Sequence, residues 1–198
     1  MTQQQTRFER AMALFDAANA EDPNQDEGQP KELLYAKRMS EMLGRFAPDA
    51  AEAVKLAVRA QHIRRWTVPR GSYPMTKEGY YAWRTGLYKF HADTAGELMR
   101  QAGYDDEMIE RVKTAVSKRG LKTNPETQLL EDVTDLVFIE HYMLAFAAGK
   151  PDYDEEKWLG IVRKTWNKMS QAAHQFALSG AVKLPEPLLP LITKAVSS

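Results

Sequence analysis

Three side chains are of types that bind divalent metals or transfer protons, and each stands in an otherwise apolar segment. His62 follows an alanine-rich run, His91 lies midway along a long periodic segment, and Asp132 lies in "QLLEDVTDLVF". Histidine nitrogens and carboxylate oxygens are ligands that a divalent ion takes, about three at a time with open positions for water. These residues predict a catalytic site in which His62, His91 and Asp132 hold one ion (Mn, Fe, Ni or Mg) that activates water.

The same residues also fit other roles. Without a metal, His62 or His91 would act as general acid–base and Asp132 would orient it. As a structural residue, His62 fits a helix end, where the dipole favours a cationic ring. His91 fits the edge of the core, hydrogen-bonded to Asp132 or a backbone carbonyl. Asp132 fits a buried partner of Arg64, Arg84 or a helix end, and Asp135 is the alternative to Asp132 as the acid of the site.

Positive charge and aromatic rings gather beside the two histidines. Between residues 59 and 89 the chain has seven Lys or Arg against one acid, which leaves six positive charges. Arginine forks suit phosphate and aromatic faces suit planar rings, so a phosphorylated or nucleotide-like small molecule is the predicted ligand. The predicted ligand-binding residues are Tyr35, Arg64, Arg65, Arg84, Tyr88, Lys118, Arg119 and Lys164.

Several of these residues have alternatives. Adjacent helical residues point about 100° apart, so one of Arg64 and Arg65 is expected to line the site and the other to be solvated. Plain core packing is the alternative for Tyr35, and a solvated charged face is the alternative for Lys164.

Helical periodicity dominates the elements that must position the two histidines. Thr6 is a candidate cap for a first helix, and residues 21–30, with four acids, two prolines and a glycine, predict an exposed loop. Residues 49–63 predict a largely buried helix that carries His62. Residues 66–76 contain two prolines and cannot continue that helix.

The rest of the chain is helical as well. A long helix from the cap Thr76 to Gly103 carries His91, and Pro125 suits the first position of an apolar central helix that carries Asp132. Two or three further helices close the chain. The sequence therefore predicts an all-α single domain of about seven to nine helices over residues 1–198.

Composition limits the possible partners and compartments. The chain has 198 residues, zero net charge and no cysteine. Zero net charge makes a nucleic-acid partner unlikely, and the absence of cysteine excludes disulfides and thiolate chemistry. No secretory signal and no membrane-length apolar run is visible, so a cytoplasmic protein with no membrane partner is predicted.

The order of the motifs "ELLYAKRMSEML", "LAVRAQHIRRW", "KFHADTAGELMRQAGY" and "LLEDVTDLVFIEH" resembles the HD-domain superfamily of metal-dependent phosphohydrolases. The resemblance covers about residues 30–145 and implies an HD-like core, with residues 150–198 packing on it as C-terminal helices. It also implies a possible homodimer. Tyr35 stands where the first metal-binding histidine would be, Ile63 replaces the aspartate of the His-Asp pair, and the region of Lys118 and Arg119 is basic where some members have another histidine.

A second resemblance extends over nearly the whole chain. The motifs "PKELLYAKRMSEML", "AQHIRRW", "YPM", "QLLEDV" and "RKTWNKMS" are similar to domain-of-unknown-function family 4202, which brings no established activity. The sequence therefore leaves two main hypotheses open. One is an HD-like phosphohydrolase, with or without a metal. The other is a non-catalytic module that binds an anionic ligand on a degenerate metal site.

Overall fold

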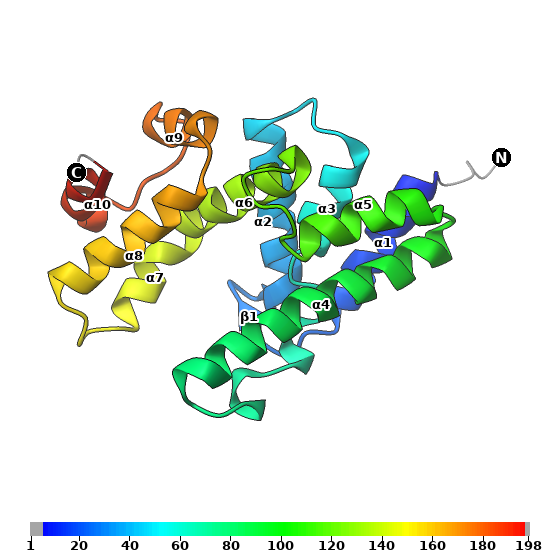
Figure 1. Cartoon of the computed structure of the whole chain (residues 1–198), viewed down its shortest axis with the longest axis horizontal. Coiled ribbons are helices and arrows are strands. Elements are labelled where there is room, and N and C mark those ends of the chain that lie inside the picture. The colour runs from blue at the N-terminus through cyan, green and yellow to red at the C-terminus, as the bar shows by residue number, and fades with distance from the viewer. Residues whose placement is uncertain (1–5, 197–198) are drawn as a thin grey trace. The chain divides into compact units, whose positions relative to one another are not determined.

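The computed structural model describes residues 6–196. This part of the chain forms ten α-helices, four short helical turns and two strands of two residues each (Figure 1). The all-α prediction is confirmed for these residues. The helices exceed the predicted seven to nine because the central helix is divided in two. No helix among the described residues is long and apolar enough to cross a membrane.

The chain divides into two compact units, Met1–Leu130 and Glu131–Ser198, with the boundary inside helix α6. In the first unit α4 packs against α1 and α5, and α3 packs against α2 and α5. The predicted single domain stays a prediction. The elements of the first unit are α1 (Arg7–Ala20), β1 (Gln25–Asp26), β2 (Gln29–Pro30), α2 (Lys31–Phe46), α3 (Glu52–Ala60), η1 (Arg65–Thr67), η2 (Arg70–Ser72), α4 (Lys77–Ala102) and α5 (Asp106–Val116).

Capping residues set the ends of the helices as the sequence predicts. The Thr6 side chain accepts from the backbone N–H of Glu9, whose carboxylate in turn accepts from the N–H of Thr6, and the two form a capping box. Helix α4 begins after Thr76, whose hydroxyl accepts from the N–H of Gly79 at 3.1 Å. It ends at Gly103, whose φ of 95° is left-handed.

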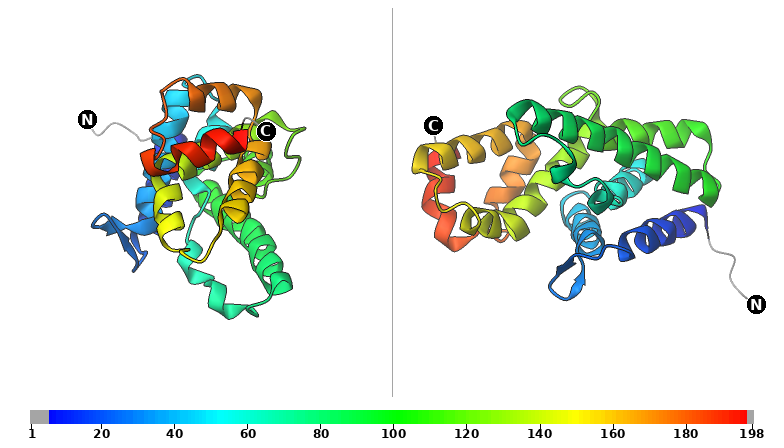
Figure 2. Two further views of the ribbon diagram at one scale, coloured as in Figure 1. Left: turned by 90° about the vertical axis from the view of Figure 1, so that its left-hand side faces the viewer. Right: turned by 90° about the horizontal axis from the view of Figure 1, so that it is seen from below.

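The predicted loop at residues 21–30 contains a short hairpin at the start of α2 (Figure 2). Its Asp22 is buried, at 3% exposure, although the sequence predicts an exposed loop. Asp22 Oδ1 accepts from the N–H of Asn24 at 2.9 Å, and Oδ2 accepts from the N–H of Glu32 at 3.0 Å. The carboxylate thus satisfies one backbone donor in the loop and one in the first turn of α2, which explains why it is buried.

Helix α3 is shorter than the predicted 49–63 helix, since it ends at Ala60 and a turn follows. Arg64 lies in this turn with a left-handed φ of 50°. The Asn19 side chain of α1 accepts from the N–H of Arg64 at 3.1 Å and holds the turn in place. Ile63 in the same turn is fully buried, and burial of its side chain anchors the turn to the core.

The core of the first unit is largely apolar, and a partly buried ion pair joins two of the helices around it. Its largest fully buried side chains include Phe15, Met39, Met42, Leu56, Met99 and Val112. Arg59 of α3 binds Asp16 of α1 through two hydrogen bonds of 2.6 and 2.7 Å. A bidentate arginine–carboxylate pair fixes both distance and orientation, so it sets the position of α3 against α1.

The second unit contains the helices that follow Leu130. The predicted central helix is interrupted by a π-helical turn, which the sequence gives no reason to expect; such turns insert one residue into the α-helical ladder. Helix α10 packs against α8. The elements are α6 (Pro125–Val137), η3 (Phe138–Tyr142), α7 (Met143–Ala148), α8 (Glu155–Lys168), α9 (Gln171–Leu178), η4 (Glu186–Leu188) and α10 (Leu189–Val196).

Lys168 of α8 joins two buried carboxylates of the second unit. Its ammonium lies 2.6 Å from Glu131 Oε1 and 2.8 Å from Asp135 Oδ1. We expect Lys168→Met to lower the free energy of unfolding by about 1–2 kcal/mol, because it removes this charge from two buried acids while solvent screens part of the effect. Lys164→Met, at an exposed position of the same helix, is the matched control for urea unfolding. Equal losses in both variants would contradict a specific role for Lys168.

Candidate functional site

His62 lies among side chains from α2 and from the turn after α3. Its ring stacks on that of Tyr35, with centroids 4.2 Å apart and planes 13° apart. Its Nε2 lies 3.1 Å from Nη1 of Arg65, and its Nδ1 lies 3.4 Å from Oε2 of Glu32. Both ring nitrogens of His62 therefore face a charged side chain.

These contacts assign the ring proton of His62. A guanidinium donates hydrogen bonds and cannot accept them, so Nε2 accepts from Arg65 and the proton of the neutral ring is on Nδ1, toward Glu32. Burial lowers the pKa of His62 well below its usual value, and the positive charges of Arg65 and Lys118 lower it further. His62 is therefore neutral at pH 7.

Glu32 is a buried carboxyl, with 7% of its surface exposed. Burial raises its pKa from the usual 4.5 to about 7, although the nearby charges of Arg65 and Lys31 act in the opposite direction. A carboxyl with a pKa near 7 can gain or lose a proton at neutral pH, which is the property of a general acid or base.

His91 of α4 is the second histidine of the cluster. Its ring centroid lies 5.7 Å from that of His62, and the ring is 2% exposed. Its Nε2 is buried and has no hydrogen-bond partner within residues 6–196. Burial, together with His62 and the charge of Arg65, lowers its pKa well below the usual value. A buried ring nitrogen without a partner costs free energy, so it points to a role in binding or catalysis.

Arg65 supplies the positive charge nearest to His62. Its guanidinium also lies over the ring of Trp83, 5.0 Å from the ring centroid. Trp83 is held in turn by a 2.9 Å hydrogen bond from its indole N–H to the carbonyl of Val68. In the part of the chain that the structure describes, Arg65 forms no ion pair with a carboxylate. Its charge is thus available to an anion.

The arrangement combines two kinds of chemistry. Arg65 is a fixed cation with planar donors, which suits a phosphate or carboxylate. Beside it lie two neutral imidazoles and a carboxyl that titrates near pH 7, which suit proton transfer. The cluster of Glu32, His62, Arg65 and His91 is therefore the candidate site.

Comparisons with known proteins identify the family. The model of a family described as "Domain of unknown function (DUF4202)" matches residues 9–192. The chain belongs to this family. No curated protein and no solved structure matches it.

In this DUF4202 chain, Arg84 and Tyr88 are the predicted ligand-binding residues of α4, and they lie on one face of the helix as their spacing requires. Nε of Arg84 donates to the Tyr88 hydroxyl at 2.8 Å, and Nη1 donates to the Tyr80 hydroxyl at 3.1 Å. Tyr80 lies beside Trp83, with centroids 6.0 Å apart. Arg84, which is exposed, and Tyr88, which is half-buried, therefore continue the group that holds Arg65.

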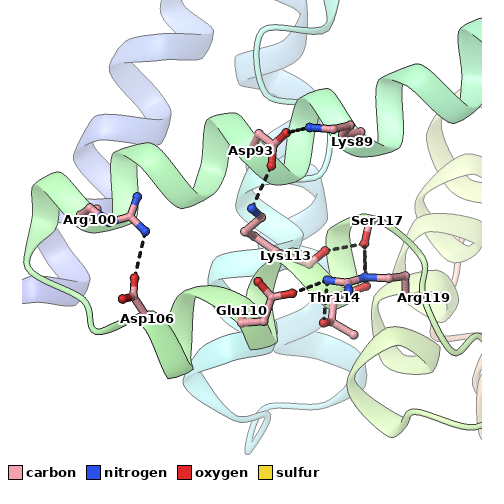
Figure 3. Close-up of polar contacts among 9 residues, drawn as sticks. All are labelled: Lys89, Asp93, Arg100, Asp106, Glu110, Lys113, Thr114, Ser117 and Arg119. Atoms are coloured by element: carbon pink, nitrogen blue, oxygen red, sulfur yellow. Dashed lines mark hydrogen bonds and ion pairs between the residues drawn. The ribbon is translucent and has the colours of Figure 1, made fainter.

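Two pairs of adjacent cations were predicted to bind the ligand, Arg64 with Arg65 and Lys118 with Arg119. In the structure the two members of each pair have different neighbours. Arg64 pairs with Glu21 at 3.4 Å on the surface, whereas Arg65 contacts His62. Arg119 donates to Glu110 at 2.6 Å and to Thr114 at 3.1 Å, and so folds back on α5 (Figure 3). Lys118 is instead the residue whose charge acts on both histidines.

Asp132 and Lys164 belong to the second unit of this DUF4202 member. The Asp132 carboxylate accepts from the N–H of Ser170 at 2.7 Å and from its hydroxyl at 2.6 Å, at the start of α9. Lys164 is exposed on α8. The first unit thus brings together His62, His91, Tyr35 and Arg65. The predicted catalytic set that includes Asp132 stays a prediction.

Sequence reasoning missed Glu32 and the role of Trp83. Glu32 lies three residues before Tyr35, so the helical repeat places both on one face of α2. The signal was an acid on the apolar face of an amphipathic helix, which resembles the signal that singled out Asp132.

The ring nitrogens of His62 do not suit a divalent ion as they stand. Nε2 already accepts from a guanidinium and Nδ1 faces Glu32, so a metal would have to displace Arg65. Within residues 6–196, no group of three or more His, Asp or Glu side chains is arranged to hold a metal ion. Ile63, where the HD-domain resemblance would have an aspartate, is a core side chain with no exposed surface.

Proposed function

We propose that this protein binds a phosphorylated or nucleotide-like small molecule at the cluster of Glu32, His62, Arg65 and His91, and hydrolyses its phosphate ester without a metal ion. The observation that carries the proposal is the Arg65 guanidinium, which has no carboxylate partner in the described chain and is held between His62 and Trp83. An HD-like arrangement of the helices is part of the proposal.

Each side chain has a role in this reaction. Arg65 binds the phosphate and offsets the charge that develops as water attacks phosphorus. His91, whose Nε2 has no hydrogen-bond partner among residues 6–196 and whose ring is neutral at pH 7, accepts the proton of that water as its oxygen bonds to phosphorus. The ester P–O bond breaks in the same step, and the leaving oxygen takes its proton from solvent water. Glu32 orients the neutral His62 ring through Nδ1, and His62 in turn holds Arg65 in place.

A non-catalytic binding module is the second candidate. The observation in its favour is that both nitrogens of His62 already contact protein groups, so this histidine is not free to transfer a proton to a ligand. In this form the cluster would capture the anion alone. Phosphate release from bound nucleotides separates the two candidates, because the module would bind them and form no product.

Titration calorimetry with inorganic phosphate and with AMP tests the binding step. We expect Arg65→Ala to weaken both affinities about tenfold or more, because the lost contact is a charge-assisted hydrogen bond to a phosphate. Arg64→Ala removes the same charge one residue earlier, from an exposed pair with Glu21, and is the matched control. Failure of the wild type to bind either compound, or equal losses in both variants, would count against the proposal.

A further inference from the structure

His62 and His91 lie close enough to be two ligands of one metal ion. Their ring centroids are 5.7 Å apart, so a nitrogen of each ring could lie about 2 Å from the same ion. His91 Nε2 has no partner among the described residues, and burial and nearby positive charge keep both rings neutral, the form that binds metals. The buried carboxyl of Glu32 lies on the other side of His62.

One group prevents this pair from acting as a metal site. Nη1 of Arg65 lies 3.1 Å from His62 Nε2 and donates to the lone pair that a metal would use. The same guanidinium also lies over the ring of Trp83, which helps to fix it. Because a guanidinium stays charged at any accessible pH, it cannot yield this lone pair by losing a proton.

We infer that Arg65 takes the place of a metal ion between the ligand and the two histidines, supplying the positive charge for the anion and keeping divalent metals off His62 and His91. The inference rests on the proposed function for the identity of the anion, and on the geometry of Arg65 for the exclusion of metal. The site would then bind its anion with the same affinity in the presence and in the absence of a metal chelator.

Removing Arg65 should create a metal site from the histidines that remain. The test is titration calorimetry of the full chain with nickel chloride, in a buffer without phosphate or chelator. We expect Arg65→Ala to bind nickel about tenfold more tightly than the wild type, because His62 Nε2 loses its contact with Arg65 and the neighbouring His91 Nε2 has no partner among residues 6–196. Adding His91→Ala to this variant should abolish the gain.

Two controls separate this effect from a general loss of charge or of folding. Arg64→Ala removes an adjacent positive charge that lies at the surface, so its nickel affinity should match that of the wild type. Arg65→Lys keeps a cation at the position and should gain no nickel affinity. Cooperative thermal unfolding of each variant checks that it is folded.

The outcomes distinguish this inference from the proposed function. If the wild type binds nickel as tightly as Arg65→Ala does, or if Arg65→Ala gains nothing while folded, the inference is overturned even when phosphate binds. If the nickel gain appears but the wild type binds no phosphate or AMP, the exclusion of metal stands and the proposed function falls.

Discussion

At pH 8 the Glu32→Gln protein is expected to be more stable than the wild type, and this advantage should largely disappear at pH 5. Burial raises the pKa of Glu32 from the usual 4.5 to about 7 in the folded protein. A raised pKa adds stability below the unfolded value, and this stability is lost as the pH rises through about 7. The difference in unfolding free energy between variant and wild type should therefore grow by about 2.5 kcal/mol from pH 5 to pH 8.

Urea unfolding at a series of pH values measures this difference. The pKa values of His62 and His91 are lowered, so these residues contribute stability above their unfolded pKa that is lost as the pH falls. Both residues are present in the variant and the wild type, so their contribution cancels to first order. Glu41→Gln, at an exposed position of the same helix, is the matched control and should show no such pH dependence. A difference that stays flat for Glu32→Gln would mean that Glu32 is ionised throughout and paired with the neighbouring cations.

The expected gain in stability also bears on function. A buried carboxyl that costs free energy at pH 8 is a poor choice for a purely structural position. If Glu32→Gln is more stable and yet loses phosphate release, then the role of Glu32 beside His62 explains why the protein keeps a carboxyl that lowers its free energy of unfolding. The loss should be greatest above pH 7, where the wild-type carboxylate is ionised and holds the Nδ1 proton of His62 most strongly.

Much of the helical framework could be predicted because local rules determine it. Thr76 and Gly103 set the ends of α4, and the Asn124 side chain accepts from the N–H of Glu126 and Thr127 at the start of α6. Each of these caps acts within a few residues of the helix end, so the sequence alone contains the information.

The elements that were missed depend on contacts between distant segments. Asp22 is buried because it binds the N–H of Glu32, ten residues later, and no pattern within 21–30 indicates this. The end of α3 depends on the side chain of Asn19, which lies 45 residues before Arg64. Helical periodicity extended the predicted helix to residue 63, because periodicity contains no information about contacts between distant segments.

The candidate site also has some features that local rules determine and others that depend on the fold. The spacing of α4 correctly placed Arg84 beside Tyr80 and Tyr88, since the helical repeat determines it. The choice between Arg64 and Arg65 could not be made from the sequence, because it depends on the left-handed backbone of Arg64 in the turn. A helix continued through this position would have directed both arginines differently.

His91→Leu is expected to raise the free energy of unfolding by about 1–2 kcal/mol at pH 7, because it removes a buried ring nitrogen that has no hydrogen-bond partner among residues 6–196. The gain should increase at pH 5, where unfolding of the wild type is favoured by protonation of a histidine whose folded pKa is lowered. The same variant should lose phosphate release, since the proposed proton acceptor is gone.

His174→Leu is the control that separates a histidine whose Nε2 has no hydrogen-bond partner among residues 6–196 from one whose Nε2 has such a partner. His174 stacks on Trp166 with centroids 4.0 Å apart, and its Nε2 lies 2.7 Å from the backbone carbonyl of Trp166. Its replacement should lower stability by about 1 kcal/mol, because the contacts that it removes are favourable. If both leucine variants are destabilised, then His91 is an ordinary core residue. If His91→Leu alone is stabilised and loses phosphate release, the protein retains His91 at a cost in stability, as a functional residue would be retained.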